Sequence, residues 1–150
     1  MIVDSSALVA IVMGEPGSDE LLSRLRAADE VGMAAPTLVE SAMVLSSRLG
    51  GDCFEMLMEL LEELNVEVLP FTKAHAKLAA MAFLEYGKGR HRAALNFGDC
   101  LTYAIAARSK RPVLFTGEDF AKAGLKRWRG EMRCGSCDDR NPDARDHRER

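Results

Sequence analysis

The chain begins Met1-Ile2-Val3-Asp4-Ser5-Ser6-Ala7-Leu8, a stretch that joins a strand pattern, a carboxylate and the start of a helix pattern. Its first three residues are apolar and predict a short buried strand over Ile2–Val3. A carboxylate follows at Asp4, two hydroxyls come next, and the apolar run Ala7–Met13 predicts a helix that ends at Gly14. In open α/β sheets the active-site crevice lies at the carboxyl ends of the strands. Asp4 is therefore a candidate functional residue.

Strand and helix patterns alternate along the rest of the chain. Helices are expected at Gly17–Ala28, Thr37–Leu49, Cys53–Leu64, Thr72–Tyr86 and Asp99–Ser109, with a short helix after Gly117. Further strands are expected at Val31–Ala35, Val66–Leu69, Val113–Phe115 and, as a short last strand, Leu125–Trp128. Strands separated by helices imply right-handed crossovers and a parallel sheet covered on both faces. The predicted fold class is α/β, with four to five parallel strands.

Length and composition predict one globular domain followed by a tail. A chain of 150 residues is long enough for one domain with a substantial core. From Gly130 onward apolar residues nearly vanish and charges of both signs alternate, so we expect a domain over 1–129 and a disordered tail over 130–150. The longest apolar run is too short to cross a bilayer, and no basic stretch precedes Asp4. A cytoplasmic protein without a membrane partner is therefore expected.

Charge is distributed unevenly, although the net charge is only −3. From Lys88 to Arg129 there are ten basic and three acidic residues, whereas Asp52 to Glu67 holds six acids and no base. This asymmetry is compatible with one face that meets phosphates, and solvated helix faces explain the acidic stretch equally well.

The cysteines predict neither a disulfide framework nor a metal site. Cys53 and Cys100 fall in apolar helical patterns and are expected to be core thiols. Cys134 and Cys137 form a lone C-x-x-C without the second pair that zinc requires, and this pair does not open a helix after a strand.

Three further acids, Glu40, Asp99 and Asp119, stand at predicted junctions before or within the first turn of a helix. In a parallel sheet these junctions meet at one edge, next to Asp4. Carboxylates gathered in one crevice repel each other unless a cation joins them. Mg²⁺ prefers carboxylate and water oxygens, and pairs of such ions can activate a water against a phosphodiester. The four acids therefore predict a divalent-metal site.

Each acid also has a structural interpretation. Thr37–Glu40 matches a helix capping box, and Thr116–Asp119 is similar. Asp99 in a first helical turn is a common complement to the helix dipole. Asp4 is harder to assign to structure alone, because it ends an apolar strand where a polar group must find partners. The occurrence of all four at one edge favours a functional site.

Other kinds of site find no support in the sequence. His75, His91 and His147 are scattered, so no zinc cluster is expected. The phosphate-binding loops G-x-x-x-x-G-K-[ST] and G-x-G-x-x-G are absent, and no serine stands in a nucleophile-elbow context.

The opening stretch, extended to Ile11, resembles the start of PIN-domain ribonucleases of the VapC toxin type. The stretch from Gly89 to Ala104, which contains Asn96-Phe97-Gly98-Asp99, is similar to the most specific segment of that family, and Leu114–Phe120 is similar to its third. The resemblance runs from Met1 to about Trp128. It implies a three-layer α/β/α sandwich, Mg²⁺- or Mn²⁺-dependent endoribonuclease activity that arrests translation, and inhibition by a cognate antitoxin.

The resemblance also implies roles for particular residues. Asp4 and Asp99 match direct metal ligands, and Glu40 and Asp119 complete the acidic pocket, directly or through water. The pocket-lining and substrate-binding positions of the family are matched by Ser6, Thr116 and Arg92. The alternative interpretation of Arg92 is an exposed arginine in a loop. Glu118 stands beside Asp119 and could serve as the fourth acid, although the family spacing favours Asp119.

Three functions remain open. The first is the metal-dependent endoribonuclease toxin, which would leave a 5′-phosphate and a 3′-hydroxyl. The second is a catalytically silent module of the same fold that acts by partner or RNA binding, against which the presence of all four acids argues. The third, a phosphohydrolase of another α/β class, would require a second aspartate where Ser6 stands.

Partners follow from the same features. An acidic crevice predicts that an antitoxin blocks it with an arginine or lysine side chain. Apolar helical residues could serve a homodimer or an antitoxin groove, although helical core is the more common explanation. These residues are Leu38, Val39, Met43, Leu57 and Leu60. The identity of the RNA target is not specified by the sequence.

Overall fold

Four parallel strands form the centre of the protein in the computed structural model, which describes residues 1–125. The elements in chain order are β1 (Ile2–Val3), α1 (Ser5–Met13), α2 (Ser18–Arg26), β2 (Val31–Ala34), α3 (Ala35–Leu49), α4 (Phe54–Glu63), β3 (Val66–Leu69), α5 (Lys73–Tyr86), α6 (Phe97–Ser109), β4 (Val113–Leu114) and α7 (Asp119–Lys122). The predicted alternation of strands and helices is therefore confirmed over this part of the chain.

The strand order places the end of β1 at a reversal of the sheet. The order is β3-β2-β1-β4, and every neighbouring pair is parallel. Ile2 pairs with Gly32 of β2 on one side and with Val113 of β4 on the other. The chain builds the sheet outward from β1 to β3 and then returns to add β4 beside β1. Ligand crevices of open α/β sheets form outside the carboxyl ends of strands at such a reversal.

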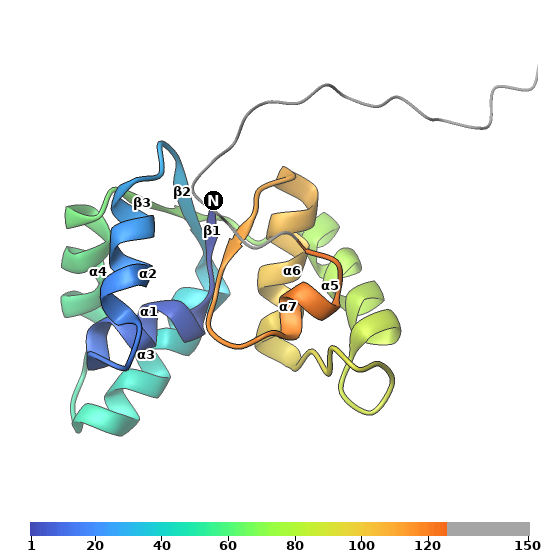
Figure 1. Cartoon of the computed structure of the whole chain (residues 1–150), viewed down its shortest axis with the longest axis horizontal. Coiled ribbons are helices and arrows are strands. Elements are labelled where there is room, and N and C mark those ends of the chain that lie inside the picture. Colours follow the sequence, from blue (N-terminus) through green and yellow to red (C-terminus); the bar gives the residue numbers. More distant parts are fainter. Residues whose placement is uncertain (126–150) are drawn as a thin grey trace, which may run out of the picture.

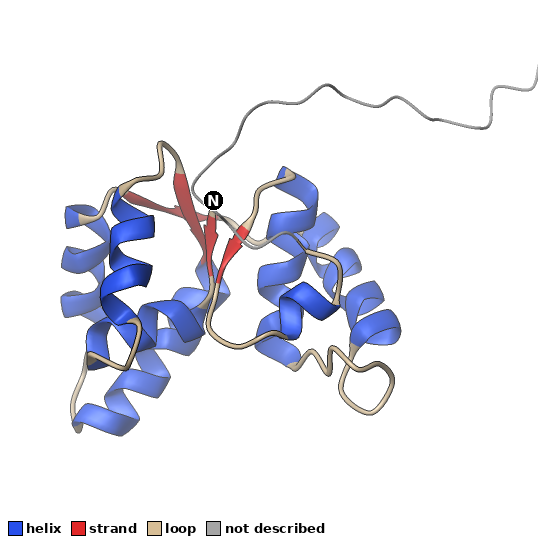
Figure 2. Cartoon of the chain, viewed as in Figure 1, coloured by secondary structure: helices blue, strands red, loops and turns tan. Residues whose placement is uncertain are grey.

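Helices cover both faces of the sheet, which gives the predicted α/β/α sandwich (Figures 1 and 2). Helices α1 to α4 lie on one face and α5 to α7 on the other. Because successive strand residues point to opposite faces, Val3 packs with the first group and Ile2 with the second. The two cores contain fully buried side chains such as Leu45 on the first side and Phe120 on the second. Truncation of such a side chain to alanine costs about 2–5 kcal/mol.

Three helices each begin two residues earlier than the sequence pattern indicates, because the N-cap residue precedes the first residue of the predicted helix by three positions. Helix α1 begins at Ser5, with Asp4 as its N-cap residue. Helix α3 begins at Ala35, since a proline in the first turn is already set for helical geometry. Helix α6 begins at Phe97, after the N-cap residue Asn96. These shifts move Glu40 out of the first turn of its helix.

The remaining predictions divide into confirmed ones and ones outside residues 1–125. Cys53 and Cys100 are buried free thiols, as expected. Leu125 is not in a strand, and the rest of the predicted strand Leu125–Trp128 lies outside the described residues, as do the domain end at 129, the tail over 130–150 and the Cys134/Cys137 pair. None of the helices within residues 1–125 has the length and hydropathy needed to span a bilayer.

Candidate active site at the carboxyl edge of the sheet

Asp4 is buried directly after β1, where its carboxylate accepts three hydrogen bonds. Only 2% of its surface is exposed. Oδ2 accepts from the backbone N–H of Ser6 at 3.0 Å and from the Ser6 hydroxyl at 2.6 Å. Oδ1 accepts from the Thr102 hydroxyl on α6 at 2.8 Å. Because a carboxylate has about four acceptor positions, these bonds fix its orientation and still leave a lone pair for a cation.

Glu40 lies in the second turn of α3 and is half-buried. The capping box predicted over Thr37–Glu40 is wrong, because α3 begins at Ala35 and Thr37 is buried with its Oγ1 3.2 Å from Thr102 Oγ1. Burial and the charge of Asp4 raise the pKa of Glu40, while a hydrogen bond with the Ser5 side chain lowers it. Glu40 Oε2 is buried and has no hydrogen-bond partner among the described residues. An unpaired buried oxygen of this kind is unusual and fits a cation ligand.

Asp99 stands in the first turn of α6 and forms a reciprocal capping box with Asn96. Its backbone N–H donates to Asn96 Oδ1 at 2.9 Å, and its Oδ2 accepts from the Asn96 N–H at 2.7 Å. The pKa of Asp99 is raised to about 6, mainly by burial and also by the charges of Asp4, Asp119 and Glu40. The hydrogen bond from the Asn96 N–H opposes this rise. Asp99 is therefore both a capping residue and a member of an acidic cluster.

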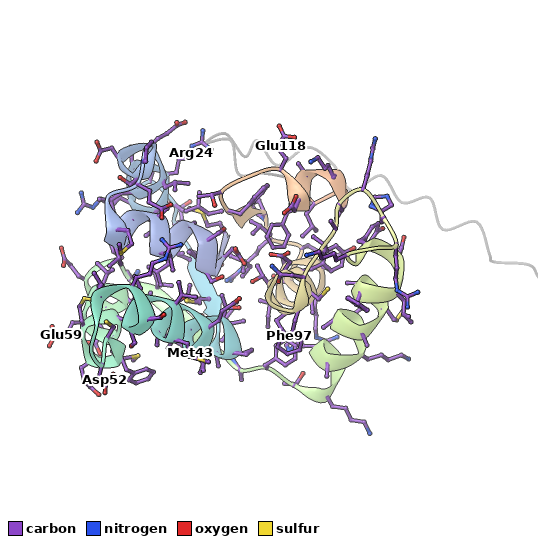
Figure 3. All side chains as sticks on the ribbon, turned by 90° about the horizontal axis from the view of Figure 1, so that it is seen from below. Arg24, Met43, Asp52, Glu59, Phe97 and Glu118 are labelled. Atoms are coloured by element: carbon purple, nitrogen blue, oxygen red, sulfur yellow. The ribbon has the colours of Figure 1, made fainter. Side chains whose placement is uncertain are left out.

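Asp119 and Glu118 differ in their surroundings although they are adjacent. Asp119 is the first residue of α7, and its charge acts on Asp99. Glu118 pairs with Lys122 at 3.6 Å, and its side chain points outward (Figure 3). The capping box predicted over Thr116–Asp119 is wrong, because α7 begins at Asp119 and its N-cap residue Glu118 makes no side-chain cap bond. Of the two acids, Asp119 rather than Glu118 is the one whose charge raises the pKa of Asp99.

The fold thus brings Asp4, Glu40, Asp99 and Asp119 together at one edge of the sheet. The charges of the other three acids are near enough to raise the pKa of Asp99. None of the four forms an ion pair within residues 1–125. No three His, Cys, Asp or Glu side chains in this part of the chain are close enough to enclose a metal ion by themselves. Mg²⁺, however, is commonly held by one or two carboxylates and keeps several waters. The residues therefore fit a hydrated divalent cation better than a closed protein cage.

The other predicted pocket residues differ in placement. The Ser6 hydroxyl bonds Asp4 and also accepts from the backbone N–H of Thr116 at 3.2 Å, so it ties α1 to the segment after β4. The Thr116 side chain is exposed. Arg92 is exposed in the segment between α5 and α6, and it contacts none of the four carboxylates within the described structure. The structure brings Ser6 and the Thr116 backbone to the site but not Arg92.

Sequence reasoning assigned no role to Thr102 or Asn96, which orient two of the acids. Thr102 is fully buried and donates to Asp4. Its signal was the three-residue spacing from Asp99, which places both on one helix face. Asn96 had a signal too, since asparagine is a preferred N-cap residue and an acid three positions later completes a capping box.

Comparison with known proteins identifies the family. The family model described as PIN domain matches residues 1–126. Ribonuclease VapC36 of Mycobacterium tuberculosis is 46% identical over 127 residues, which cover 84% of this chain and 91% of that protein. Ribonuclease VapC of Mycolicibacterium smegmatis is 43% identical over 121 residues, which cover 80% of this chain and 93% of that protein.

Solved structures agree in fold. Mycobacterium tuberculosis VapC20, described as a Sarcin-Ricin loop cleaving toxin, superimposes with a TM-score of 0.69 at 20% identity, over 85% of this chain and 98% of that one. A toxin–antitoxin complex from Klebsiella pneumoniae matches with a TM-score of 0.59 at 15% identity, over 80% and 89% of the two chains. Taken with the family model and the more similar relatives, the chain belongs to the PIN-domain family, in its VapC branch.

Proposed function

We propose that this protein is a divalent-metal-dependent endoribonuclease toxin of a toxin–antitoxin pair, which hydrolyses RNA phosphodiesters and so inhibits translation. Relatives that share up to 46% identity are named ribonucleases, which supports the activity. The observation that carries the chemistry is geometric. Asp4 accepts a hydrogen bond from Thr102 of α6, the helix that carries Asp99. The Glu40 carboxylate, whose Oε2 has no hydrogen-bond partner among residues 1–125, lies against Gly98, the residue before Asp99. Four acids without a basic partner there are costly to keep ionised unless a cation joins them.

In this proposal Asp4 and Asp99 are the direct ligands of Mg²⁺, with Mn²⁺ as a substitute. Glu40 and Asp119 complete the pocket, directly or through water. A bound divalent cation would neutralise charge on the phosphodiester and lower the pKa of a water molecule. Ser6 and Thr102 hold the Asp4 carboxylate in one orientation, and Asn96 does the same for Asp99. The protein thus supplies a fixed set of oxygen ligands.

The proposed reaction is hydrolysis of one phosphodiester bond. The oxygen of a water molecule forms a bond to phosphorus, and the bond from phosphorus to the 3′ oxygen breaks. The products are a 3′-hydroxyl and a 5′-phosphate. Arg92 is exposed in a segment that also carries Lys88 and Arg90, so this segment is suited to contact RNA phosphates flanking the cleaved bond.

We also propose that the protein binds a cognate antitoxin and a second copy of itself. We propose a location in the cytoplasm, where RNA and ribosomes are found. A cognate antitoxin would place an arginine or lysine against the unpaired acids. Val39 and Met43 on α3 are 52% and 68% exposed, and Met43 is visible in Figure 3, so they can contact an antitoxin or a second copy. Leu38 and Leu57 are buried and Leu60 is half-buried, so these three serve mainly the core.

The test is induced expression of the wild type beside Asp99→Asn in a bacterial host, with sequencing of RNA 5′ ends. Growth arrest and discrete new 5′-phosphate ends with the wild type alone are the expected result. The asparagine still accepts the capping bond from Asn96, so the variant should remain folded. If both soluble proteins leave growth and RNA unchanged, the chain is instead a catalytically silent module that acts by binding.

A further inference from the structure

Helices α3 and α6 contact each other at two successive turns beside the acidic site. At the first contact Thr37 Oγ1 lies 3.2 Å from Thr102 Oγ1, and Thr102 in turn donates to Asp4. Glu40 follows Thr37 by three residues, and Gly98 precedes Thr102 by four. The two helices therefore run in opposite senses here, and the next contact brings Glu40 against Gly98.

Gly98 has no side chain, and the Glu40 carboxylate fills the space that a side chain would take. A methyl carbon on Gly98 would lie 2.7 Å from Cδ of Glu40 and closer still to both of its carboxylate oxygens. Real Cβ atoms essentially never come within 3.0 Å of a heavy atom from a residue that is distant in sequence. The Glu40 carboxylate can therefore occupy this position only because residue 98 has no Cβ.

Neither backbone conformation nor helix propensity explains a glycine at this position. Gly98 is not among the residues with positive φ in the described chain, so an alanine could adopt the same backbone. Glycine inside a helix is also less favourable than alanine. Within residues 1–125 two other glycines would clash if they gained a Cβ, but Gly32 faces the Leu69 side chain and Gly87 faces the backbone and ring of Phe83. Gly98 is the one that faces a carboxylate.

We propose that Gly98 is a positioning residue, whose missing side chain keeps the Glu40 carboxylate inside the acidic site beside Asp99. The inference rests on the proposed function for its consequence, because Glu40 matters there as part of the cation pocket. The atoms that would clash are the far end of a flexible side chain. An added methyl group therefore displaces the carboxylate rather than the helices, and Gly98→Ala removes Glu40 from the site without removing its charge from the protein.

The first measurement is Mn²⁺ binding to the metal-free protein, followed by the electron paramagnetic resonance signal of free and bound Mn²⁺. Gly98→Ala should weaken binding about 10-fold or more, the range found when a group that orients metal ligands is lost. In a Glu40→Ala background the same change should have almost no further effect, since the displaced group is already absent. Gly51→Ala is the matched control, because Gly51 has ordinary φ and open space around its Cβ position.

The second measurement is thermal unfolding, without metal, of the wild type, Gly98→Ala, Glu40→Ala and the double variant, and it does not depend on the proposed function. In the Glu40→Ala background, Gly98→Ala should raise the midpoint of unfolding by a few degrees, because only the helix preference remains. In the wild-type background the clash should cancel that gain. The role of Gly98 would be overturned if Gly98→Ala shifted the midpoint of unfolding equally in the wild type and in Glu40→Ala. It would also be overturned if Gly98→Ala bound Mn²⁺ with wild-type affinity. A wild type that binds no Mn²⁺ would instead overturn the metal-dependent function, while the unfolding comparison would still decide on Gly98.

Discussion

Both edges of the sheet carry acidic residues, but the acids at the two edges differ in their burial and in their basic partners. At the amino edge, Glu30 Oε2 is paired with Arg111 Nη2 at 2.6 Å, and the Glu30 side chain is 74% exposed. The amino group of Met1 donates to the Glu30 carbonyl oxygen beside this pair. An acidic cavity at this edge is lined by Asp29, Glu62 and Glu67 together with Arg111. Glu30 is paired with an arginine, and the acids that line the cavity are exposed to water, which solvates their charges.

At the carboxyl edge, four acids meet, and none of them forms an ion pair with a basic side chain of residues 1–125. Asp4 is only 2% exposed, and burial together with neighbouring carboxylates raises the pKa of Asp99 to about 6. An arrangement that destabilises the folded protein and is not relieved by a basic side chain is typical of a functional site. The comparison shows that burial and the lack of a basic partner, rather than the number of acids, distinguish a functional site from a solvated surface.

The largest expected effect comes from Asp4→Asn. The change removes one ligand charge from the centre of the carboxyl edge, so RNA cleavage should fall by more than about 100-fold. Purified protein and a radiolabelled RNA substrate would measure this, with circular dichroism as the check on folding. Wild-type cleavage by a folded Asp4→Asn protein would remove the distinction between the two edges.

Thr102→Val should have the next largest effect. It removes the donor to Asp4 Oδ1 at a fully buried position while keeping the shape of the side chain. Loss of a group that orients a metal ligand lowers activity by about 10–100-fold. Thr102→Ser keeps the hydroxyl and should retain most of the activity. If valine and serine variants cleave RNA equally well, the hydrogen bond to Asp4 does not position the carboxylate.

A smaller effect is expected on the stability of the metal-free protein as a function of pH. The pKa of Asp99 is raised from 3.8 to about 6 in the folded state, so the folded state binds this proton more tightly than the unfolded state does. The resulting stabilisation is full below pH 4 and is lost as the pH rises through about 6. Because Asp99 is only partly buried, we expect a difference of about 1 kcal/mol.

Urea unfolding of the wild type and of Asp99→Asn between pH 4 and pH 8 would measure this contribution. At pH 7.5 the asparagine variant should be the more stable protein, and the two should converge toward pH 4. A variant that is less stable than the wild type at neutral pH would mean that capping by the Asp99 carboxylate outweighs its repulsion.

The smallest effect is expected at the amino edge. Glu30→Gln breaks the exposed pair with Arg111 and should cost under about 1 kcal/mol, with no change in RNA cleavage. Chemical unfolding and the same cleavage assay would check both quantities. A large loss of activity from this change would show that the two edges are functionally connected.

The sequence was sufficient to predict the parallel sheet and to select the four acids as candidates. The strand patterns can be recognised from neighbouring residues in the chain. Strand Val66–Leu69 was predicted with its observed bounds, since two valines alternating with Glu67 and a proline directly after Leu69 form a local strand signal. Asp4, Asp99 and Asp119 could be brought together from topology alone, because parallel strands end at one edge. Whether these residues bind a metal remains a prediction of the proposed function.

The capping arrangements and the contacts between helices could not be predicted in the same way. Thr37 fits a capping box by spacing, but tertiary packing against Thr102 places it in the core instead. The dependence of Glu40 on the space at Gly98 joins residues 58 positions apart on two helices, and no local pattern encodes it. Sequence periodicity indicates which face of a helix is buried, whereas the fold decides what that face meets.

The most direct test of the account is the metal dependence of RNA cleavage by the purified protein. The protein would be treated with a chelator, dialysed, and then titrated with Mg²⁺, Mn²⁺ or Ca²⁺, with Asp4→Asn and Glu30→Gln measured alongside. The account predicts no cleavage without metal, recovery with Mg²⁺ or Mn²⁺ in the wild type and in Glu30→Gln, and no recovery in Asp4→Asn. Cleavage by the wild type that persists without any divalent cation would contradict it.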